Sequence, residues 1–161
     1  MHFSILKADY SNPQHAAAIV YLLNHYAEDL MGGGRPLPVE VSENLVAELA
    51  QRPFALSLLA YTADTPVGLV NAFEGFSTFA CKPLINIHDI AVHRDYRGQG
   101  VGRQLLAGVE QIANERGCCK LTLEVLSDNS NAKVVYQRFG FAPYSLRADT
   151  GNAEFWQKLL D

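Results

Sequence analysis

The sequence predicts one α/β domain, residues 1–161, in which a mixed sheet of six to seven strands is flanked by about four helices. Three observations lead to this prediction. The 161 residues are enough to bury one substantial hydrophobic core. Hydrophobic residues make up 48% of the chain and charged residues 19%, as in ordinary globular proteins. Segments with the period of a strand and segments with the period of a helix follow one another along the whole chain.

The first half of the chain contains a strand, two helices and a hairpin. Asn12 and Pro13 are a helix-start signal, and the apolar residues after them recur at helical spacing. Residues 31–38 are rich in glycine and proline and are expected to form a mobile connection. The expected elements are a strand at 2–8, a helix opened by Asn12, a helix capped by Ser42 and ended by Pro53, and strands at 54–62 and 66–76 joined by a turn.

The second half of the chain alternates strands with helices. Residues 85–92 form an apolar run that predicts a buried strand, and the helix after it carries apolar residues from Val101 to Ala113. The remaining expected elements are a strand at 120–126, a helix at 129–139, and a closing antiparallel pair at 141–147 and 152–160.

A glycine-rich turn from Arg97 to Gly102 separates the buried strand from the following helix. The first N–H groups of a helix have no partner within the helix, and the helix dipole places partial positive charge there. Glycines remove the side chains that would keep a phosphate group away from these N–H groups. The turn therefore predicts a binding site for a phosphate or a pyrophosphate.

Two well-known kinds of phosphate-binding turn match this spacing less well. A Walker loop requires Lys followed by Ser or Thr, whereas Arg103 and Gln104 follow Gly102. A dinucleotide-binding turn has glycines spaced G-x-G-x-x-G and an acidic residue on the next strand. The glycine spacing differs here, but Glu124 lies on that strand, so this alternative is weakened and stays open. A glycine turn without a ligand is the third alternative.

Composition excludes several classes of protein. The net charge is −4, which argues against a protein that binds nucleic acid through its charge alone. No signal peptide and no apolar run of about 20 residues is visible, so we expect a cytoplasmic protein without a membrane segment. The three cysteines, Cys81, Cys118 and Cys119, lack metal-binding spacing, and we expect reduced, mostly packed thiols and no metal.

Two motifs in register resemble the GCN5-related N-acetyltransferase (GNAT) superfamily. The run from His88 to Val92, followed by Arg97-x-x-Gly100-x-Gly102, is similar to that family's acetyl-CoA motif. The run 123–126, followed by Asn129-x-x-Ala132-x-x-x-Tyr136-x-x-x-Gly140-Phe141, is similar to its second signature. With the order of elements, the resemblance covers nearly the whole chain. It implies a mostly antiparallel sheet in which two splayed neighbouring strands hold the cofactor.

The resemblance implies acetyl-CoA as co-substrate. The pyrophosphate would bind the N–H groups of the glycine turn, and the pantetheine arm would pair with the strand edge at residues 90–92. Asn129 would cap the last helix and also bind the pantetheine. The residues assigned to the cofactor are Ile90, Ala91, Val92, Arg97, Gly98, Gln99, Gly100, Val101, Gly102, Arg103, Asn129 and Asn131.

The resemblance also implies direct attack of an amine on the acetyl group in a ternary complex. Tyr136 stands at the family's tyrosine position and would protonate the departing thiolate as general acid. His88 and Glu74 are the candidate bases. An imidazole changes its charge near neutral pH, and His88 occupies a place where some small-amine acetyltransferases carry a glutamate. Water relayed through several groups is an alternative base.

The acceptor is not specified by the motifs. A small-molecule primary amine is expected, and the candidate acceptor residues are Tyr26, Glu28, Asp29 and Phe79, which combine acidic and aromatic side chains. Sequence similarity to diamine acetyltransferases is confined to the cofactor-binding half of the chain. The alternatives are a protein or peptide N-acetyltransferase, a non-catalytic module that binds acyl-CoA, and a domain without ligand. A homodimer is expected from the family.

Overall fold

The computed structural model of the chain describes residues 2–160. The chain divides into two compact units, residues 1–123 and residues 124–161, and each unit is described by itself. The expectation that residues 1–161 form one domain stays a prediction.

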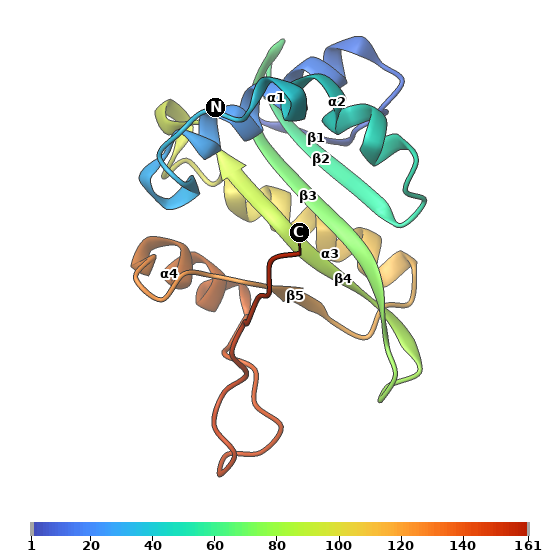
Figure 1. The fold of residues 1–161 in the computed structure, drawn as a ribbon, viewed down its shortest axis with the longest axis vertical. Helices are drawn as coiled ribbons and strands as arrows, with labels where there is room; N and C mark the ends of the chain where they lie inside the picture. Colours follow the sequence, from blue (N-terminus) through green and yellow to red (C-terminus); the bar gives the residue numbers. More distant parts are fainter. Residues whose placement is uncertain (1, 161) are drawn as a thin grey trace. The chain divides into compact units, whose positions relative to one another are not determined.

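Unit 1 is built on a five-stranded sheet with the strand order β1-β2-β3-β4-β5 (Figure 1). Neighbouring strands are antiparallel except for β4 and β5, which are parallel. The strands are β1 Ser4–Lys7, β2 Ala55–Thr62, β3 Thr65–Ser77, β4 Lys82–Val92 and β5 Leu121–Leu123. The prediction of a mixed, mostly antiparallel sheet is therefore confirmed, but in place of the expected six or seven strands the described residues form five.

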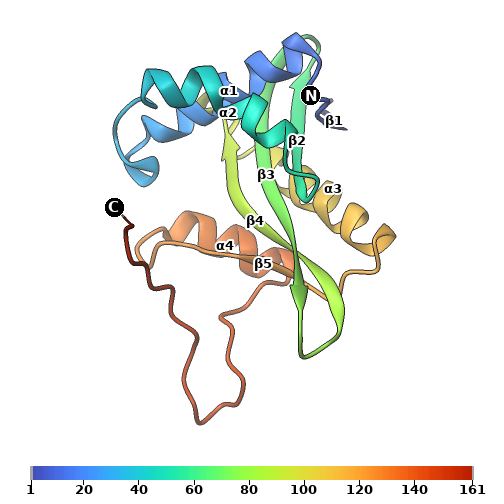
Figure 2. The same cartoon turned by 45° about the vertical axis from the view of Figure 1, so that its right-hand side comes forward.

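Helices cover both faces of this sheet (Figure 1, Figure 2). Helices α1 (Pro13–Ala27) and α2 (Val39–Ala50) lie on one face, and α3 (Val101–Glu115) lies on the other. With α4 in unit 2 they make the four helices expected. Asn12 begins α1 as predicted, because its side-chain oxygen accepts the N–H of Gln14 at 2.9 Å. The second helix begins earlier than predicted: Pro38 precedes it, and Ser42 lies inside its first turns.

Each face of the sheet has its own hydrophobic core. On the α1 face, Ile19 and Leu22 of α1 pack with Leu59 of β2 and Leu69 of β3. On the α3 face, the backbone of α3 approaches β3 closely at Gly68, where a Cβ would lie 2.9 Å from two α3 side chains. The apolar residues of α3 that were predicted from spacing are buried, namely Val101, Leu105, Leu106, Val109 and Ala113.

The connection at residues 31–38 is more ordered than its composition suggested. A short 3-10 helix, η1 (Leu30–Gly32), continues directly from the end of α1. A Cβ at Gly32 would lie 1.8 Å from the carbonyl oxygen of Tyr26, so only glycine fits there. Gly33 and Gly34 both have positive φ. The glycine run therefore builds a tight turn on the end of α1.

Unit 2 contains α4 (Ser130–Phe139), which ends at Gly140 with φ 109°. The predicted strand at 120–126 is shorter, because only Leu121–Leu123 pair with β4. The predicted closing pair at 141–147 and 152–160 is wrong at the level of strands. One backbone hydrogen bond, from the N–H of Ala153 to the oxygen of Tyr144 at 2.7 Å, joins the two segments. A single bond is too short a ladder to hold two strands in register.

Candidate functional site

The glycine turn leaves the N-terminus of α3 open. Gly98 and Gly100 have φ of 74° and 88°, which favours glycine. No side chain caps the first N–H groups of α3, and a Cβ at either glycine would meet no atom within 4 Å. The turn thus combines unpaired N–H groups with open space in front of them. A phosphate group fits this arrangement.

Arg97 links the glycine turn to the end of α1. Its guanidinium donates to the Asp29 carboxylate at 2.6 Å and to the backbone oxygen of Val92 at 3.1 Å. The bound guanidinium lowers the pKa of the Asp29 carboxyl. Two residues that were assigned to different ligands, Arg97 to the cofactor and Asp29 to the acceptor, are therefore bound to each other in this structure.

The second half of β4 has an open edge within unit 1. The N–H of His93 donates to the oxygen of Val67 at 2.9 Å, which places Val92 at a position of the β3–β4 pair without direct hydrogen bonds. The N–H and C=O of Val92 therefore point away from β3, as do those of Ile90, while those of Ala91 point toward β3. Strand β5 pairs with β4 only at Ile85–Ile87. Along this half of β4 no strand of unit 1 takes up the outward-facing groups of Ile90 and Val92, although the Val92 oxygen accepts from the Arg97 guanidinium at 3.1 Å. An extended peptide-like ligand can pair with the remaining groups.

A β-bulge brings two titratable side chains to one face of β4. The register shifts so that Asn71 faces Asp89 while the next residue of β3 faces Ile87, which leaves His88 without a partner. Asp89 accepts a hydrogen bond from Asn71 at 3.0 Å, and the His88 ring packs edge-on against Phe73 at 5.5 Å. Phe73 packs on the α1 face of the sheet, so His88 and Asp89 both lie on that side.

Glu74 lies on the opposite face and forms an ion pair. Its carboxylate is 2.7 Å from the guanidinium of Arg116, at the C-terminal end of α3. Burial raises the pKa of the nearby Cys118 thiol, and the charge of Glu74 raises it further. The structure therefore separates Glu74 from His88 and from the glycine turn. Cys81 and Cys119 are exposed, contrary to the expectation of mostly packed thiols.

The predicted acceptor residues fall into two separate places. Tyr26, Glu28 and Asp29 lie at the end of α1. Phe79 lies between β3 and β4, in the turn of their hairpin, and is 92% exposed. Burial raises the pKa of Tyr26, and the negative charges of Asp89 and Asp29 raise it further. Tyr26 therefore belongs to the surroundings of Asp89. The structure does not bring Phe79 to this group.

Two stacked histidines lie between the end of α1 and the glycine turn. The rings of His25 and His93 stack with centroids 4.2 Å apart, and Tyr21 stacks on His93 at 6.0 Å. The backbone N–H of Arg94 donates to Nε2 of His25 at 3.2 Å, so His25 acts as an acceptor there. Burial lowers the pKa of His25, and the charges of His93, Arg94 and Arg97 lower it further.

The remaining predicted residues lie in unit 2. Asn129 caps α4 as predicted, because its side-chain oxygen accepts the N–H of Ala132 at 3.2 Å. Asn131 is exposed, and Tyr136 lies on α4 with its ring 6.0 Å from that of Phe141. Their roles toward a cofactor stay predictions.

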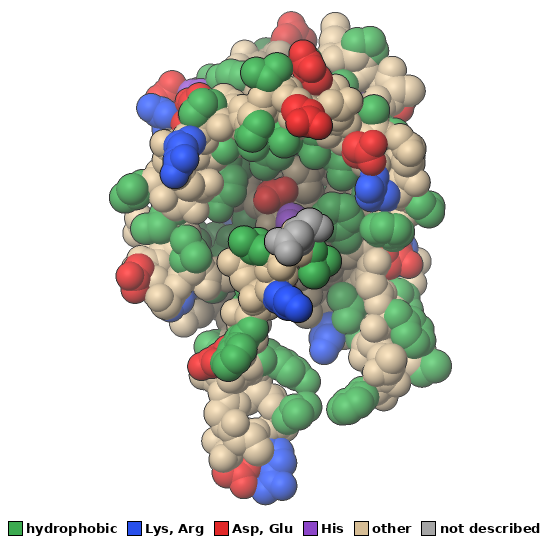
Figure 3. Space-filling model, viewed as in Figure 1, with side chains coloured by type: hydrophobic (Ala, Val, Ile, Leu, Met, Phe, Trp, Pro, Cys, Tyr) green, Lys and Arg blue, Asp and Glu red, His purple; other side chains and the backbone are tan. Residues whose placement is uncertain are grey.

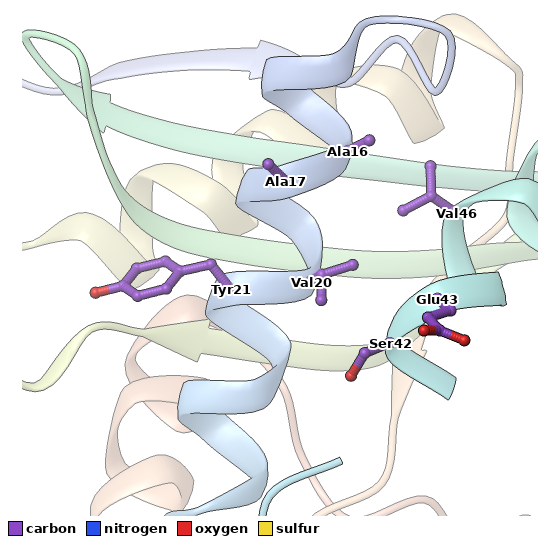
Figure 4. Close-up of a pocket in the computed structure, with 7 residues that line it drawn as sticks. All are labelled: Ala16, Ala17, Val20, Tyr21, Ser42, Glu43 and Val46. Atoms are coloured by element: carbon purple, nitrogen blue, oxygen red, sulfur yellow. The ribbon is translucent and has the colours of Figure 1, made fainter. Parts of the chain in front are cut away.

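A shallow groove of about 500 Å³ lies between α1 and α2 (Figure 4). Val20 and Val46 line it, and the Tyr21 ring points away from α2. None of the predicted site residues lines this groove, and we therefore assign it no catalytic role. A second groove of about 430 Å³ includes Glu28 and His25. Acidic side chains gather on the upper part of the face in Figure 3. The exposed acidic residues at the end of α1 and along α2 are Glu28, Glu40, Glu43 and Glu48.

Within residues 2–160, no cluster of three or more metal-binding side chains is present. In the same range no helix has the length and apolar character needed to cross a membrane.

The family model of the acetyltransferase (GNAT) family matches residues 19–141. The chain belongs to this family. It is an acetyl-CoA-dependent N-acetyltransferase that acts on amines.

This acetyltransferase is similar to characterised relatives. It is 30% identical over 128 residues to thialysine N-epsilon-acetyltransferase from Bos taurus, covering 73% of this chain and 71% of that protein. A crystal structure of a probable acetyltransferase matches it with a TM-score of 0.80 and 23% identity, covering 96% of this chain and 98% of the other. An aminoglycoside N-acetyltransferase in complex with CoA matches with a TM-score of 0.75 and 20% identity, covering 98% and 95%.

The partners of Asp89 in this acetyltransferase were not predicted from the sequence. Asn71 on β3 and Ser57 on β2 are joined to it by hydrogen bonds across the sheet. The available signal was a polar residue within the apolar run of each strand, but the alignment of these residues with Asp89 depends on the register and the bulge.

Proposed function

We propose that this acetyltransferase transfers the acetyl group of acetyl-CoA to a primary amine of a small cationic molecule, by direct attack within a ternary complex. The observation that carries the proposal is the open N-terminus of α3 beside the open edge of β4. These two features offer donors for a pyrophosphate and a strand edge for a pantetheine arm. The residue ranges involved are 90–92 and 97–103.

The proposed roles on the acetyl-CoA side follow from the backbone. N–H groups of the glycine turn bind the pyrophosphate, with Arg103 adding positive charge. Ile90 and Val92 pair with the pantetheine arm, and a backbone N–H at this edge stabilises the negative charge that develops on the acetyl oxygen. Asn129 and Asn131 are the proposed pantetheine contacts from unit 2. Arg97 needs one further step, because it must leave Asp29 or share its charge to reach a phosphate.

The chemistry requires one proton acceptor and one proton donor. Acetyl-CoA supplies a thioester carbonyl that a neutral amine can attack. As the C–N bond forms and the C–S bond breaks, the amine nitrogen loses a proton and the departing sulfur gains one. His88 is the proposed base, and Tyr136 is the proposed acid. Glu74 has less support as a base, because it is bound to Arg116 on the other face of the sheet.

The proposal of a small cationic acceptor rests on charge near the bulge. The negative charge of Asp89 acts on Tyr26, and the exposed Glu28 lies at the end of α1. Such surroundings attract an ammonium ion. The relatives that act on thialysine and on aminoglycosides also have amine substrates. A cytoplasmic location and a homodimer are proposals that rest on the sequence alone.

The deciding experiment measures thiol release from acetyl-CoA with purified protein and a panel of amines. The panel contains butylamine, 1,4-diaminobutane, spermidine, an aminoglycoside and a peptide with a free N-terminus. We expect release with the small polycationic amines and not with the peptide. Tyr136→Phe is expected to lower kcat by about 10²-fold or more while leaving CoA affinity unchanged. Bound acetyl-CoA without release for any amine would contradict the proposal.

A further inference from the structure

Two buried side chains in the core are polar. Among residues 2–160, the buried side chains are apolar except for Ser57 and Asn71, which are 1% and 3% exposed. Ser57 lies on β2 and Asn71 lies opposite it on β3, on the face that carries α1. Burying a hydroxyl and an amide gains little net stability even when both are hydrogen-bonded. An apolar pair would serve the core equally well, so stability does not explain this pair.

These two residues are the middle of a hydrogen-bonded chain that has one direction. The Ser57 hydroxyl donates to Oδ1 of Asn71 at 2.7 Å, and Nδ2 of Asn71 donates to Oδ2 of Asp89 at 3.0 Å. A serine hydroxyl has only one hydrogen, so the bond of 3.0 Å between Tyr10 and Ser57 must be donated by Tyr10. Every bond therefore donates toward Asp89.

The ends of this chain fix the orientation of the Asn71 amide. A carboxylate only accepts hydrogen bonds, so the NH₂ group must face Asp89 and the oxygen must face Ser57. Bonds that all point the same way strengthen one another. Asp89 is thus held by a donor whose own orientation is set from the interior of the sheet.

Asp89 is placed to meet a cation. The bulge at His88 puts both side chains on the α1 face, and the Asp89 charge acts on the Tyr26 hydroxyl. Among the residues that the structure describes, no ion pair joins Asp89 to a basic side chain, whereas Asp29 is paired with Arg97. Asp89 is therefore a partly buried negative group that, like the exposed Glu28, forms no ion pair with an arginine or lysine of the described chain.

We propose that Ser57 and Asn71 are positioning residues for the acceptor. They hold the Asp89 carboxylate in one orientation, and that carboxylate binds the ammonium group of the amine substrate beside His88. The inference rests on the proposed function, since it names the group that binds the acceptor in the same site. It assigns the buried polar pair to acceptor affinity, with no part in acetyl-CoA binding.

The first test compares two Ser57 variants with side chains of the same shape, only one of which has a hydroxyl. Ser57→Thr keeps the hydroxyl and Ser57→Val replaces it with a methyl group, so both variants add the same volume to the core. We expect Ser57→Val to raise the KM for spermidine about tenfold relative to Ser57→Thr, since a misplaced anchor weakens binding. The KM for acetyl-CoA is expected to be equal in the two variants.

The second test removes the charge of Asp89, which is partly exposed and whose replacement leaves the core intact. Asp89→Asn keeps an oxygen that accepts from Asn71 but loses the negative charge. We expect the KM for spermidine to rise by about 10- to 100-fold, as for a lost charge-assisted hydrogen bond. The control is Asp64→Asn, in the exposed β2–β3 turn, which is expected to change neither KM.

Calorimetric titration of spermidine into the CoA-bound protein separates this inference from the proposed function. Equal affinity in wild type and Asp89→Asn overturns the inference, as does a Ser57→Val variant with the KM values of Ser57→Thr. Spermidine binding that depends on Asp89, without thiol release by wild type, supports the inference and contradicts the proposed function. If no amine of the panel binds to wild type, both are overturned.

Discussion

Single glycines at the ends of helices are needed for different physical reasons. Gly100 has φ 88° and open space beyond its Cα, so its requirement is conformational. Gly32 has the opposite requirement, because a Cβ there would collide with the backbone of α1. Gly117, just after α3, has φ 68° and open space, which makes it the conformational equivalent of Gly100 at the other end of the helix.

This equivalence allows a matched test of the glycine turn. Gly100→Ala and Gly117→Ala are each expected to cost about 1–2 kcal/mol of unfolding free energy, because both force an alanine into the left-handed region. Gly100→Ala alone is expected to weaken CoA binding, since its Cβ enters the space before the α3 N-terminus. Thermal unfolding and CoA titration of both variants measure this. Equal CoA affinity in the two variants would contradict a pyrophosphate site at the turn.

At the scale of elements, β3 and α3 pack closely against each other at Gly68. A Cβ at Gly68 would lie 2.9 Å from side-chain carbons of Leu105 and Val101. Gly75 on the same strand has ordinary contacts, since a Cβ there would lie 3.5 Å from Leu84. Both glycines lie on β3, but Gly68 faces side chains of α3 and Gly75 faces Leu84 of β4.

The pair Gly68→Ala and Gly75→Ala measures how tightly α3 is seated. We expect Gly68→Ala to lower the free energy of unfolding by about 1–3 kcal/mol through overpacking. Gly75→Ala is expected to change it by less than about 0.5 kcal/mol, as for a substitution away from tight packing. Urea unfolding of both variants gives the values. Equal stability would mean that α3 shifts freely on the sheet.

The sequence predicted the elements that depend on local backbone needs, and it did not predict the features that depend on how strands pair. The turn at Arg97 to Gly102 and the cap at Asn129 were predictable, because local backbone needs specify these residues. The partners of Asp89 were not, because they depend on a bulge that shifts the β3–β4 register by one residue. The closing antiparallel pair at 141–147 and 152–160 was wrong, because a strand also needs a neighbour to pair with along its length.

For the molecule as a whole, the stacked histidines predict how stability depends on pH. The pKa of His25 is lowered from its ordinary value of 6.5 in the folded protein. Below about pH 6.5 the unfolded chain therefore binds more protons than the folded one, and the free energy of unfolding falls as the pH falls. At higher pH the full contribution is present. Acid also removes the acceptor that His25 offers to the N–H of Arg94.

Thermal unfolding at pH 8 and at pH 5.5 tests this dependence. We expect the wild-type melting temperature to drop on acidification, and that of His25→Gln to drop by less, because a glutamine offers an acceptor that does not titrate. The melting temperatures at pH 8 give the cost of the lost ring stack and serve as the reference. An identical drop in both proteins would remove His25 as a source of the acid sensitivity.

Strand β4 has a different neighbour along each half of its length. Its first half is an interior strand between β3 and β5, while within unit 1 Ile90 and Val92 present a row of donors and acceptors that no strand covers, with the Val92 oxygen bound by Arg97. An uncovered row of this kind is where chains add to one another and aggregate. The edge that suits a peptide-like substrate is thus also a self-association hazard. In this acetyltransferase, a ligand bound along the edge of β4 would therefore also block strand addition by a second copy of the chain.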